Sequence, residues 1–158
     1  MIAVVQRVAR ASVDVEPTDG QARHHAAIEA GLCVLLGVEQ GDAVAEADWI
    51  AGKMARLRIF RDDDGKMNRS VQETGGSVLL VSQFTLAGDC AKGNRPSFVH
   101  AADPAEGERL YERVAEVLRT EHDLTVATGV FGAMMRVSLV NDGPVTLIVR
   151  KPDRVGRD

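Results

Sequence analysis

The chain has 158 residues, of which 45% are hydrophobic and 27% are charged, and its formal net charge is −4. This length fits one domain with its own core, and a negative chain is not expected to be a general nucleic-acid coat protein. No apolar run approaches the roughly 20 residues of a membrane span, and the first residues lack a signal-peptide pattern. We therefore expect a cytoplasmic protein that has neither a membrane nor DNA as a partner.

The first third of the chain has the patterns of strands. Residues 1–8 predict a strand that presents one face made by Ile2, Val4, Gln6 and Val8. Residues 11–16 alternate between apolar and polar side chains, as half-buried strands do. Pro17-Thr18-Asp19-Gly20 predicts a turn. The continuous apolar run Leu32–Val38 then predicts a strand buried on both faces.

A helix, a short strand and a turn are predicted next. Asp42 is placed to cap a helix that runs to about Arg56, with an apolar stripe formed by Val44, Ala47, Ile50, Ala51 and Met54. A short strand, Leu57–Phe60, follows. Asp62-Asp63-Asp64-Gly65 predicts a hairpin turn. It is not a calcium loop, because the alternating Asp positions and the closing Glu are missing.

The second half of the chain continues this alternation. Ser77–Leu86 predicts a strand and Gly88–Pro96 a polar loop, and Asp103-Pro104-Ala105-Glu106 is typical of a helix start. Strands are expected at Leu124–Val130, Met134–Val140 and Val145–Arg150, before a polar tail at residues 151–158. The order of elements predicts a single α/β domain in which two helices pack on a mostly β body.

Few residues in this chain suggest side-chain chemistry. There is no Gly-x-Ser-x-Gly elbow, phosphate-binding glycine loop or His-Glu-x-x-His motif. Cys33 and Cys90 have no Cys or His at metal-ligand spacing, so we expect no metal. Two unusual runs remain, Ser82-Gln83-Phe84-Thr85 and Asn141-Asp142-Gly143-Pro144. Local physics alone leaves open that the first is a strand end with Phe84 in the core and the second an ordinary tight turn.

The two runs together resemble the signature pair of the D-aminoacyl-tRNA deacylases, also called the D-tyrosyl-tRNA deacylase family. The resemblance extends over nearly the whole chain, because shorter strings occur in the family's order and spacing. These strings are Gln6-Arg7-Val8, Ala11-Ser12-Val13, Leu35-Leu36-Gly37-Val38, Gly65-Lys66-Met67-Asn68, Gly75-Gly76-Ser77-Val78-Leu79, Gly93-Asn94-Arg95-Pro96-Ser97-Phe98 and Val137-Ser138-Leu139-Val140.

The resemblance implies a fold, an activity and site residues. Residues 1–150 would form a deacylase domain with a barrel-like β body, active as a homodimer without a cofactor. The partner would be the 3′ end of an aminoacyl-tRNA, whose ester to a D-amino acid is hydrolysed. The catalytic pocket would be lined by Ser82, Gln83, Phe84 and Thr85. Gly143 and Pro144 would form a cis element inserted into the other subunit's site, braced by Arg7.

This reading carries a mechanism. Main-chain carbonyls of Gly143 and Pro144 would accept hydrogen bonds from the substrate's α-ammonium and so fix its chiral centre. The wrong hand would then clash with backbone, while many D-residues and glycine would fit. Backbone N–H groups near Phe84 and Thr85 would stabilise the oxyanion. Thr85 is either a nucleophile or a positioning hydroxyl, and in the second case the tRNA 2′-hydroxyl helps activate water.

Other interpretations stay open at this point. One is an esterase of similar fold with relaxed handedness. Another is a non-catalytic dimeric module that binds an RNA end or a small ligand.

Three basic pairs are possible phosphate contacts, namely Arg7 with Arg10, Lys66 with Arg69 and Lys92 with Arg95. The sequence departs from the family pattern at Ala26, Val130, Gly132 and Met134, outside both runs.

Overall fold

The structure is a computed structural model that describes residues 1–16, 21 and 23–152. Its main sheet has six strands in the order β2-β1-β3-β6-β7, with β8 paired to β1. The strands are β1 (Ile2–Glu16), β2 (Arg23–Ile28), β3 (Gly31–Gly37), β6 (Ser77–Ser82), β7 (Val126–Thr128) and β8 (Met134–Arg150). The strands β3, β6 and β7 are parallel, whereas β1 is antiparallel to β2, β3 and β8.

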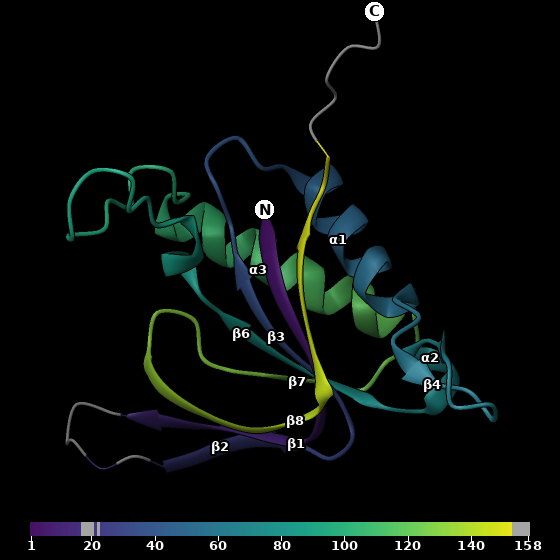
Figure 1. The fold of residues 1–158 in the computed structure, drawn as a ribbon. Helices are drawn as coiled ribbons and strands as arrows, with labels where there is room; N and C mark the ends of the chain where they lie inside the picture. The colour runs from purple at the N-terminus through teal and green to yellow at the C-terminus, as the bar shows by residue number, and fades with distance from the viewer. Residues whose placement is uncertain (17–20, 22, 153–158) are drawn as a thin grey trace, which may run out of the picture.

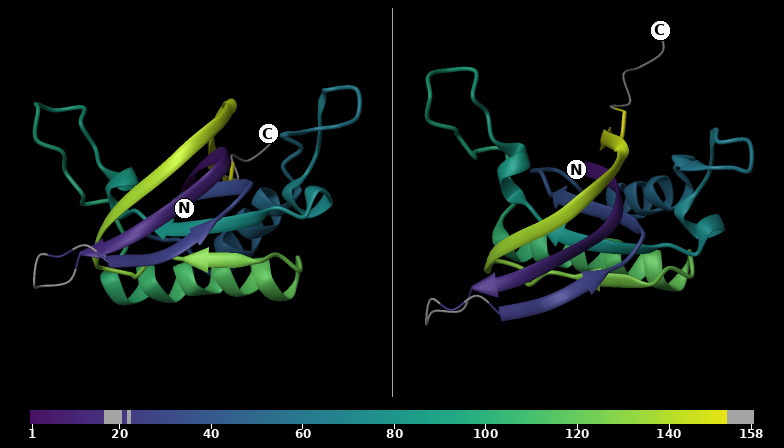
Figure 2. Two further views of the ribbon diagram at one scale, coloured as in Figure 1. Left: turned by 90° about the horizontal axis from the view of Figure 1, so that it is seen from below. Right: turned by 60° about the horizontal axis from the view of Figure 1, so that its bottom comes forward.

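The helices cover one face of this sheet. They are α1 (Val44–Arg56), α2 (Val71–Thr74) and α3 (Pro104–Thr120), with a short 3-10 helix η1 (Phe84–Ala87). Figure 1 shows α3 behind the sheet, and Figure 2 shows β1 and β8 curving over the opposite side. A small hairpin of β4 (Phe60–Arg61) and β5 (Met67–Arg69) lies beside α2. The predicted α/β domain with a curled, barrel-like β body is confirmed.

The hydrophobic core has two parts because the sheet curls. The larger part lies between the sheet and the helices and includes Leu32, Ile50 and Leu110. The smaller part fills the inside of the curl and includes Val13, Ile28 and Leu79. Strand β3 supplies both parts, as expected for the run that was predicted to be buried on two faces.

Strand β1 joins the two predicted strands into one. In its first half Ala3 and Val5 are fully buried, while Val4 and Gln6, from the predicted even-numbered face, are half-buried. The alternation then shifts, because the pairing with β8 is irregular between Gln6 and Arg10. As a result β1 is long enough to pair with β3, then with β2, and with β8 throughout.

The helix predicted from Asp42 to Arg56 is present, but its cap is different. Ala43 is the N-cap residue, and its N–H donates to the carboxylate of Glu46 at 3.1 Å. The carboxylate of Asp42 instead accepts from the Met1 ammonium at 2.6 Å and from the Glu39 N–H at 2.7 Å. The predicted apolar stripe is buried except for Val44, whose side chain is exposed at the first turn.

The predicted turn at residues 62–65 and the predicted start of the second long helix are confirmed, but their details differ. The turn at residues 62–65 joins β4 and β5, and the carboxylate of Asp62 accepts from the N–H groups of Asp64 and Lys66. The predicted strand at residues 57–60 is shorter and later, because β4 is Phe60–Arg61. Helix α3 begins at Pro104 as predicted, but the Asp103 side chain makes no capping hydrogen bond.

Other boundaries were predicted wrongly. Strand β6 ends at Ser82 rather than residue 86, because η1 begins at Phe84. The two strands predicted at residues 134–140 and 145–150 are one strand, β8. Helix α2 was missed, although Ser70 and Glu73 form a capping box that the sequence displays. The predicted turn at residues 17–20 and most of the tail lie outside the described residues.

Candidate active site

The Ser82–Thr85 run lies where β6 ends and the chain turns into η1. The Gln83 N–H still donates to the Leu36 carbonyl of β3 at 2.8 Å, which ties the run to the neighbouring strand. Gly37 makes this close approach possible, since a Cβ there would lie 3.0 Å from the Gln83 carbonyl oxygen. The run therefore sits at the carboxyl end of two parallel strands, a common position for ligand sites in α/β sheets.

The side chains of this run are open to solvent. Phe84 is 57% exposed, and its ring meets the edge of Phe98 with 5.3 Å between ring centroids. The run does begin at a strand end, as β6 ends at Ser82, but the interpretation that puts Phe84 in the core is wrong. The Gln83 amide donates to the Thr85 hydroxyl oxygen. This contact orients Thr85 but cannot remove its proton, because an amide N–H is a donor and not a base.

Among the described residues, no histidine or carboxylate is hydrogen-bonded to the hydroxyl of Ser82 or Thr85. None of the four histidines forms a hydrogen bond with either hydroxyl in the described part of the chain. His24 instead lies 3.4 Å from Asp14 on β1. Burial raises the pKa of the Cys33 thiol to about 11, so it stays protonated at neutral pH. Among the residues that the structure describes, no group of three His, Cys, Asp or Glu side chains is placed to hold a metal.

The second run, residues 141–144, is a corner inside a continuous strand. On one side of it Asn141 pairs with Val8, and on the other Thr146 pairs with Gln6, so both arms follow β1. The Gly143–Pro144 peptide bond is cis, and Gly143 has a φ of 123° that only glycine adopts readily. The chain does not reverse here, so the interpretation as an ordinary tight turn is wrong. Both residues are exposed.

The corner is anchored from below by Arg7, whose side chain is buried. The Arg7 Nε group donates to the Asp142 carbonyl at 3.1 Å, and Nη1 donates to the Ile59 carbonyl at 2.6 Å. The Asn141 amide adds hydrogen bonds of 3.0 Å to the carbonyls of Arg7 and Val145. Arg7 thus contacts the corner, as expected, and also ties it to the segment before β4, which the sequence did not suggest.

The two runs lie far apart within one chain. Ser82 pairs with Leu36 and Leu36 with Ala3, whereas the corner lies level with Arg7 on β1. That offset of four residues corresponds to about 13 Å along the strands, and three strand spacings add about 14 Å across the sheet. Along the sheet, the corner and the Ser82–Thr85 run are therefore well separated within one protomer.

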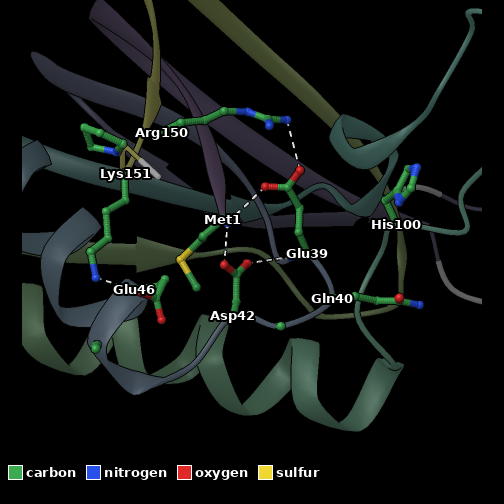
Figure 3. A pocket seen from close by; sticks show the side chains of 11 residues that line it. Met1, Glu39, Gln40, Asp42, Glu46, His100, Arg150 and Lys151 are labelled. Carbon is green, nitrogen blue, oxygen red and sulfur yellow. Dashed lines mark hydrogen bonds and ion pairs between the residues drawn. The ribbon is translucent and has the colours of Figure 1, made fainter. Parts of the chain in front are cut away.

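A polar pocket of about 760 Å³ lies where the start of β1 and the end of β8 meet the beginning of α1, and Figure 3 shows its side chains. Its charged groups pair with one another. The Met1 ammonium contacts Glu39 at 3.0 Å, Arg150 contacts Glu39 at 2.9 Å, and Lys151 contacts Glu46 at 2.7 Å. The pocket holds none of the predicted site residues, and its satisfied ion pairs join β8, α1 and the first strand.

Comparison with known proteins decides the family. The family described as D-Tyr-tRNA(Tyr) deacylase matches residues 4–150. The chain belongs to this family. A protein named D-aminoacyl-tRNA deacylase from Geobacter metallireducens is 56% identical over 99% of both chains. One of the same name from Geobacter sulfurreducens is 57% identical over 98% of this chain and 97% of the relative.

Solved structures agree with the family's fold. A structure titled "c-Myc DNA Unwinding Element Binding Protein" is 41% identical and superposes with a TM-score of 0.85 over 96% of this chain and 99% of that one. A second, titled as a probable eukaryotic D-amino acid tRNA deacylase, has a TM-score of 0.76 at 17% identity, with coverage of 94% and 97%. At that identity the second likeness concerns the fold alone.

No helix in the described ranges is long and apolar enough to cross a membrane.

Two features of this deacylase-family site were not found from the sequence. The first is Ile59, whose carbonyl accepts a hydrogen bond from Arg7, the side chain that also donates to the corner. It carries no local signal, because a main-chain acceptor contributes nothing to a sequence pattern. The second is Phe98, which packs on Phe84. Its string at residues 93–98 was noted for the family resemblance, so the signal was present without a role.

Proposed function

We propose that the protein is a D-aminoacyl-tRNA deacylase, a hydrolase of translation quality control that binds the 3′ end of a charged tRNA. It cleaves the ester and releases free tRNA and the D-amino acid. The observation that carries this proposal is the family match over residues 4–150, with both signature runs intact. The same activity extends to mischarged glycyl-tRNA, because glycine has no side chain to reject.

The active unit in this proposal is a homodimer in which each corner completes the other protomer's site. The distance between the two runs within one chain supports this arrangement. Strand β8 supports it too, because its apolar residues Met134 and Ile148 are 71% and 72% exposed. Within the described residues no strand pairs with the outer edge of β8. An unpaired apolar edge of this length favours association with a second copy.

Handedness is read by main-chain atoms in this proposal. The carbonyls of Gly143 and Pro144 accept hydrogen bonds from the α-ammonium, which fixes three directions around the chiral carbon. The D side chain then points to open space, whereas an L side chain meets backbone that Arg7 holds in place. Because rejection depends on a clash and not on side-chain contacts, chemically different D-residues are accepted.

Hydrolysis depends on the Ser82–Thr85 run. The first N–H groups of η1, at Phe84 and Thr85, have no acceptor within the helix and suit a developing oxyanion. One such donor is worth about 3–4 kcal/mol in other enzymes. Thr85, oriented by the Gln83 amide, positions the ester. The 2′-hydroxyl of the terminal adenosine assists the attacking water, since no basic side chain among the described residues is hydrogen-bonded to Thr85.

Matched D-, L- and glycyl-tRNA substrates test this function. We expect the purified protein to release the D-amino acid fastest, glycine more slowly and the L-amino acid least. Comparable release of D- and L-forms would replace the proposal with an esterase of relaxed handedness. Binding of tRNA without any release would leave a non-catalytic RNA-end module. Sedimentation in the same buffer should give a dimer, and an active monomer would contradict the shared site.

A further inference from the structure

A second pocket lies away from both signature runs, between the end of α1 and the start of α2. It has a volume of about 470 Å³ and is lined by Arg56, Arg58, Ser70, Gln72 and Glu73. Two arginines and one glutamate line it, so the lining carries a positive surplus in a chain of net charge −4. A pocket of this charge suits an anion with several oxygens.

The cationic groups of this pocket are available to a ligand. Within the described residues no acidic side chain pairs with Arg56, which is exposed at the last turn of α1. Arg58 is held in place, because Nε and Nη2 donate to the carbonyl and side-chain oxygens of Asn68 at 2.9 and 3.0 Å. Its Nη1 group has no acceptor in the described ranges. The Glu73 carboxylate is already engaged by the Ser70 N–H at 2.6 Å.

This pocket is fixed relative to the corner. Arg58 precedes Ile59, whose carbonyl accepts from Arg7 Nη1, and consecutive Cα atoms are only about 3.8 Å apart. The other end of the same guanidinium holds the Asp142 carbonyl, directly before Gly143. One buried side chain therefore links the pocket segment to the corner, so the two move together as a unit.

We propose that the pocket of Arg56 and Arg58 binds a backbone phosphate of the tRNA whose 3′ end lies in the partner protomer's site. This inference rests on the proposed function, because it takes the corner to reach that site. RNA brings phosphates wherever its 3′ end is bound, and phosphate contacts supply much of nucleic-acid affinity. Because Arg58 is next to Ile59, which Arg7 joins to the corner, we place the pocket against the nucleotides that precede the ester.

Binding of uncharged tRNA tests the pocket without any chemistry. Arg56→Ala removes one cation together with its packing over Gly52, and Lys53→Ala removes the same charge from the same helix outside the pocket. We expect Arg56→Ala to weaken tRNA binding about tenfold, the usual loss for one charge-assisted contact. The salt dependence of log K should fall by about 0.7–0.9. Lys53→Ala should change neither, and Arg56→Lys should restore most of the affinity.

Hydrolysis kinetics distinguish a role of the pocket in tRNA binding from a role in the chemical step. With D-aminoacyl-tRNA, Arg56→Ala should raise KM about tenfold at unchanged kcat. With a D-aminoacyl ester of adenosine alone, which has no backbone phosphate, both constants should match the unchanged protein. Equal tRNA affinity of Arg56→Ala and Lys53→Ala would overturn the pocket assignment. An inorganic phosphate site, unrelated to RNA, would be indicated if phosphate binding needed Arg56 and tRNA binding did not.

Mixed dimers test the placement in the partner. One protomer is unchanged, and the other has an intact run but carries Gly143→Ala with Arg56→Ala. Only the site that takes its corner from the unchanged, first protomer then stays active. The surviving site should show the KM of the unchanged protein, because its phosphate contact comes from the first protomer. A tenfold higher KM would place the pocket on the same protomer's substrate and overturn the proposal. Lack of hydrolysis by the unchanged protein would contradict only the proposed function, since tRNA affinity still reports on the pocket.

Discussion

The Ser82–Thr85 run and the Gly143–Pro144 corner are both exposed, but the protein holds them differently. The run is held by its pairing with β3 at Ser82 and Gln83, by main-chain bonds within η1 and by the contact between its own side chains Gln83 and Thr85. The corner is held on both arms by β1 and from below by Arg7, which is 3% exposed. The contrast fits their proposed tasks. A corner that rejects L-amino acids by a steric clash has to be rigid. The run has to position only the ester group, whatever the side chain of the substrate.

Breaking the corner itself should give the largest effect. In Gly143→Ala the new Cβ would lie 2.5 Å from Arg7 Nη2, at a φ of 123° that L side chains rarely adopt. We expect hydrolysis of D-aminoacyl-tRNA to fall more than about a hundredfold, with a modest loss of stability. Gly41→Ala is the matched control, since it has a φ of 83° and open space around it. Equal activity of the two variants would contradict the role of the corner.

Substitution of Arg7 tests whether the corner has to be held rigidly. Arg7→Met leaves the buried carbonyl of Ile59 and the part-buried carbonyl of Asp142 without their donor. The free energy of unfolding should fall by about 2–4 kcal/mol, measured by urea denaturation. In the folded fraction the ratio of D to L hydrolysis should fall about tenfold or more. Arg7→Lys should recover little, because one ammonium does not span both carbonyls. A folded variant with an unchanged ratio of D to L hydrolysis would contradict the proposal that a rigid corner discriminates between the two substrates.

The run should tolerate change better than the corner. Thr85→Ser keeps the hydroxyl and Thr85→Val removes it, and both keep the side chain exposed. If Thr85 only positions the ester, kcat falls about tenfold or less in Thr85→Val and hardly in Thr85→Ser, as single-turnover rates would show. A loss of about 10⁴-fold or more in Thr85→Val would instead identify a nucleophile.

The smallest effect concerns the pocket shown in Figure 3. A hydrogen bond from Lys151 lowers the pKa of Glu46. A carboxyl whose pKa is lower in the folded state stabilises the protein above its unfolded value of about 4.3 and loses this as the pH falls further. Glu46→Gln should therefore reduce the decline of stability below about pH 4.3 by a few tenths of a kcal/mol, since solvent screens this pair. Thermal unfolding at pH 6 and pH 3 measures the difference.

The fold and the site could be predicted from the sequence to different depths. Element types followed from periodicity, as for the buried run at residues 32–38, and the two signature runs were recognised by their strings. Boundaries failed where a tertiary contact overrode local chemistry. Asp42 has the right chemistry for a cap, but the Met1 ammonium engages its carboxylate.

The relation between the two runs was not predictable from the strings. Nothing in Asn141-Asp142-Gly143-Pro144 indicates that the strand continues without reversing, because Gly-Pro usually marks a turn. Its position depends on pairing with a strand that begins at residue 2, and Arg7 meets Ile59 across 52 residues of chain. Such contacts are set by the register of the sheet, which only the structure provides.

The pairing of both arms of β8 with one partner strand has a further consequence for kinetics. In the proposed function the corner is already paired along both arms, so little ordering entropy is lost when the substrate arrives. Selection between mirror-image substrates should then be complete at first contact, so that the slow step, if one precedes chemistry, belongs to the RNA and not to the protein.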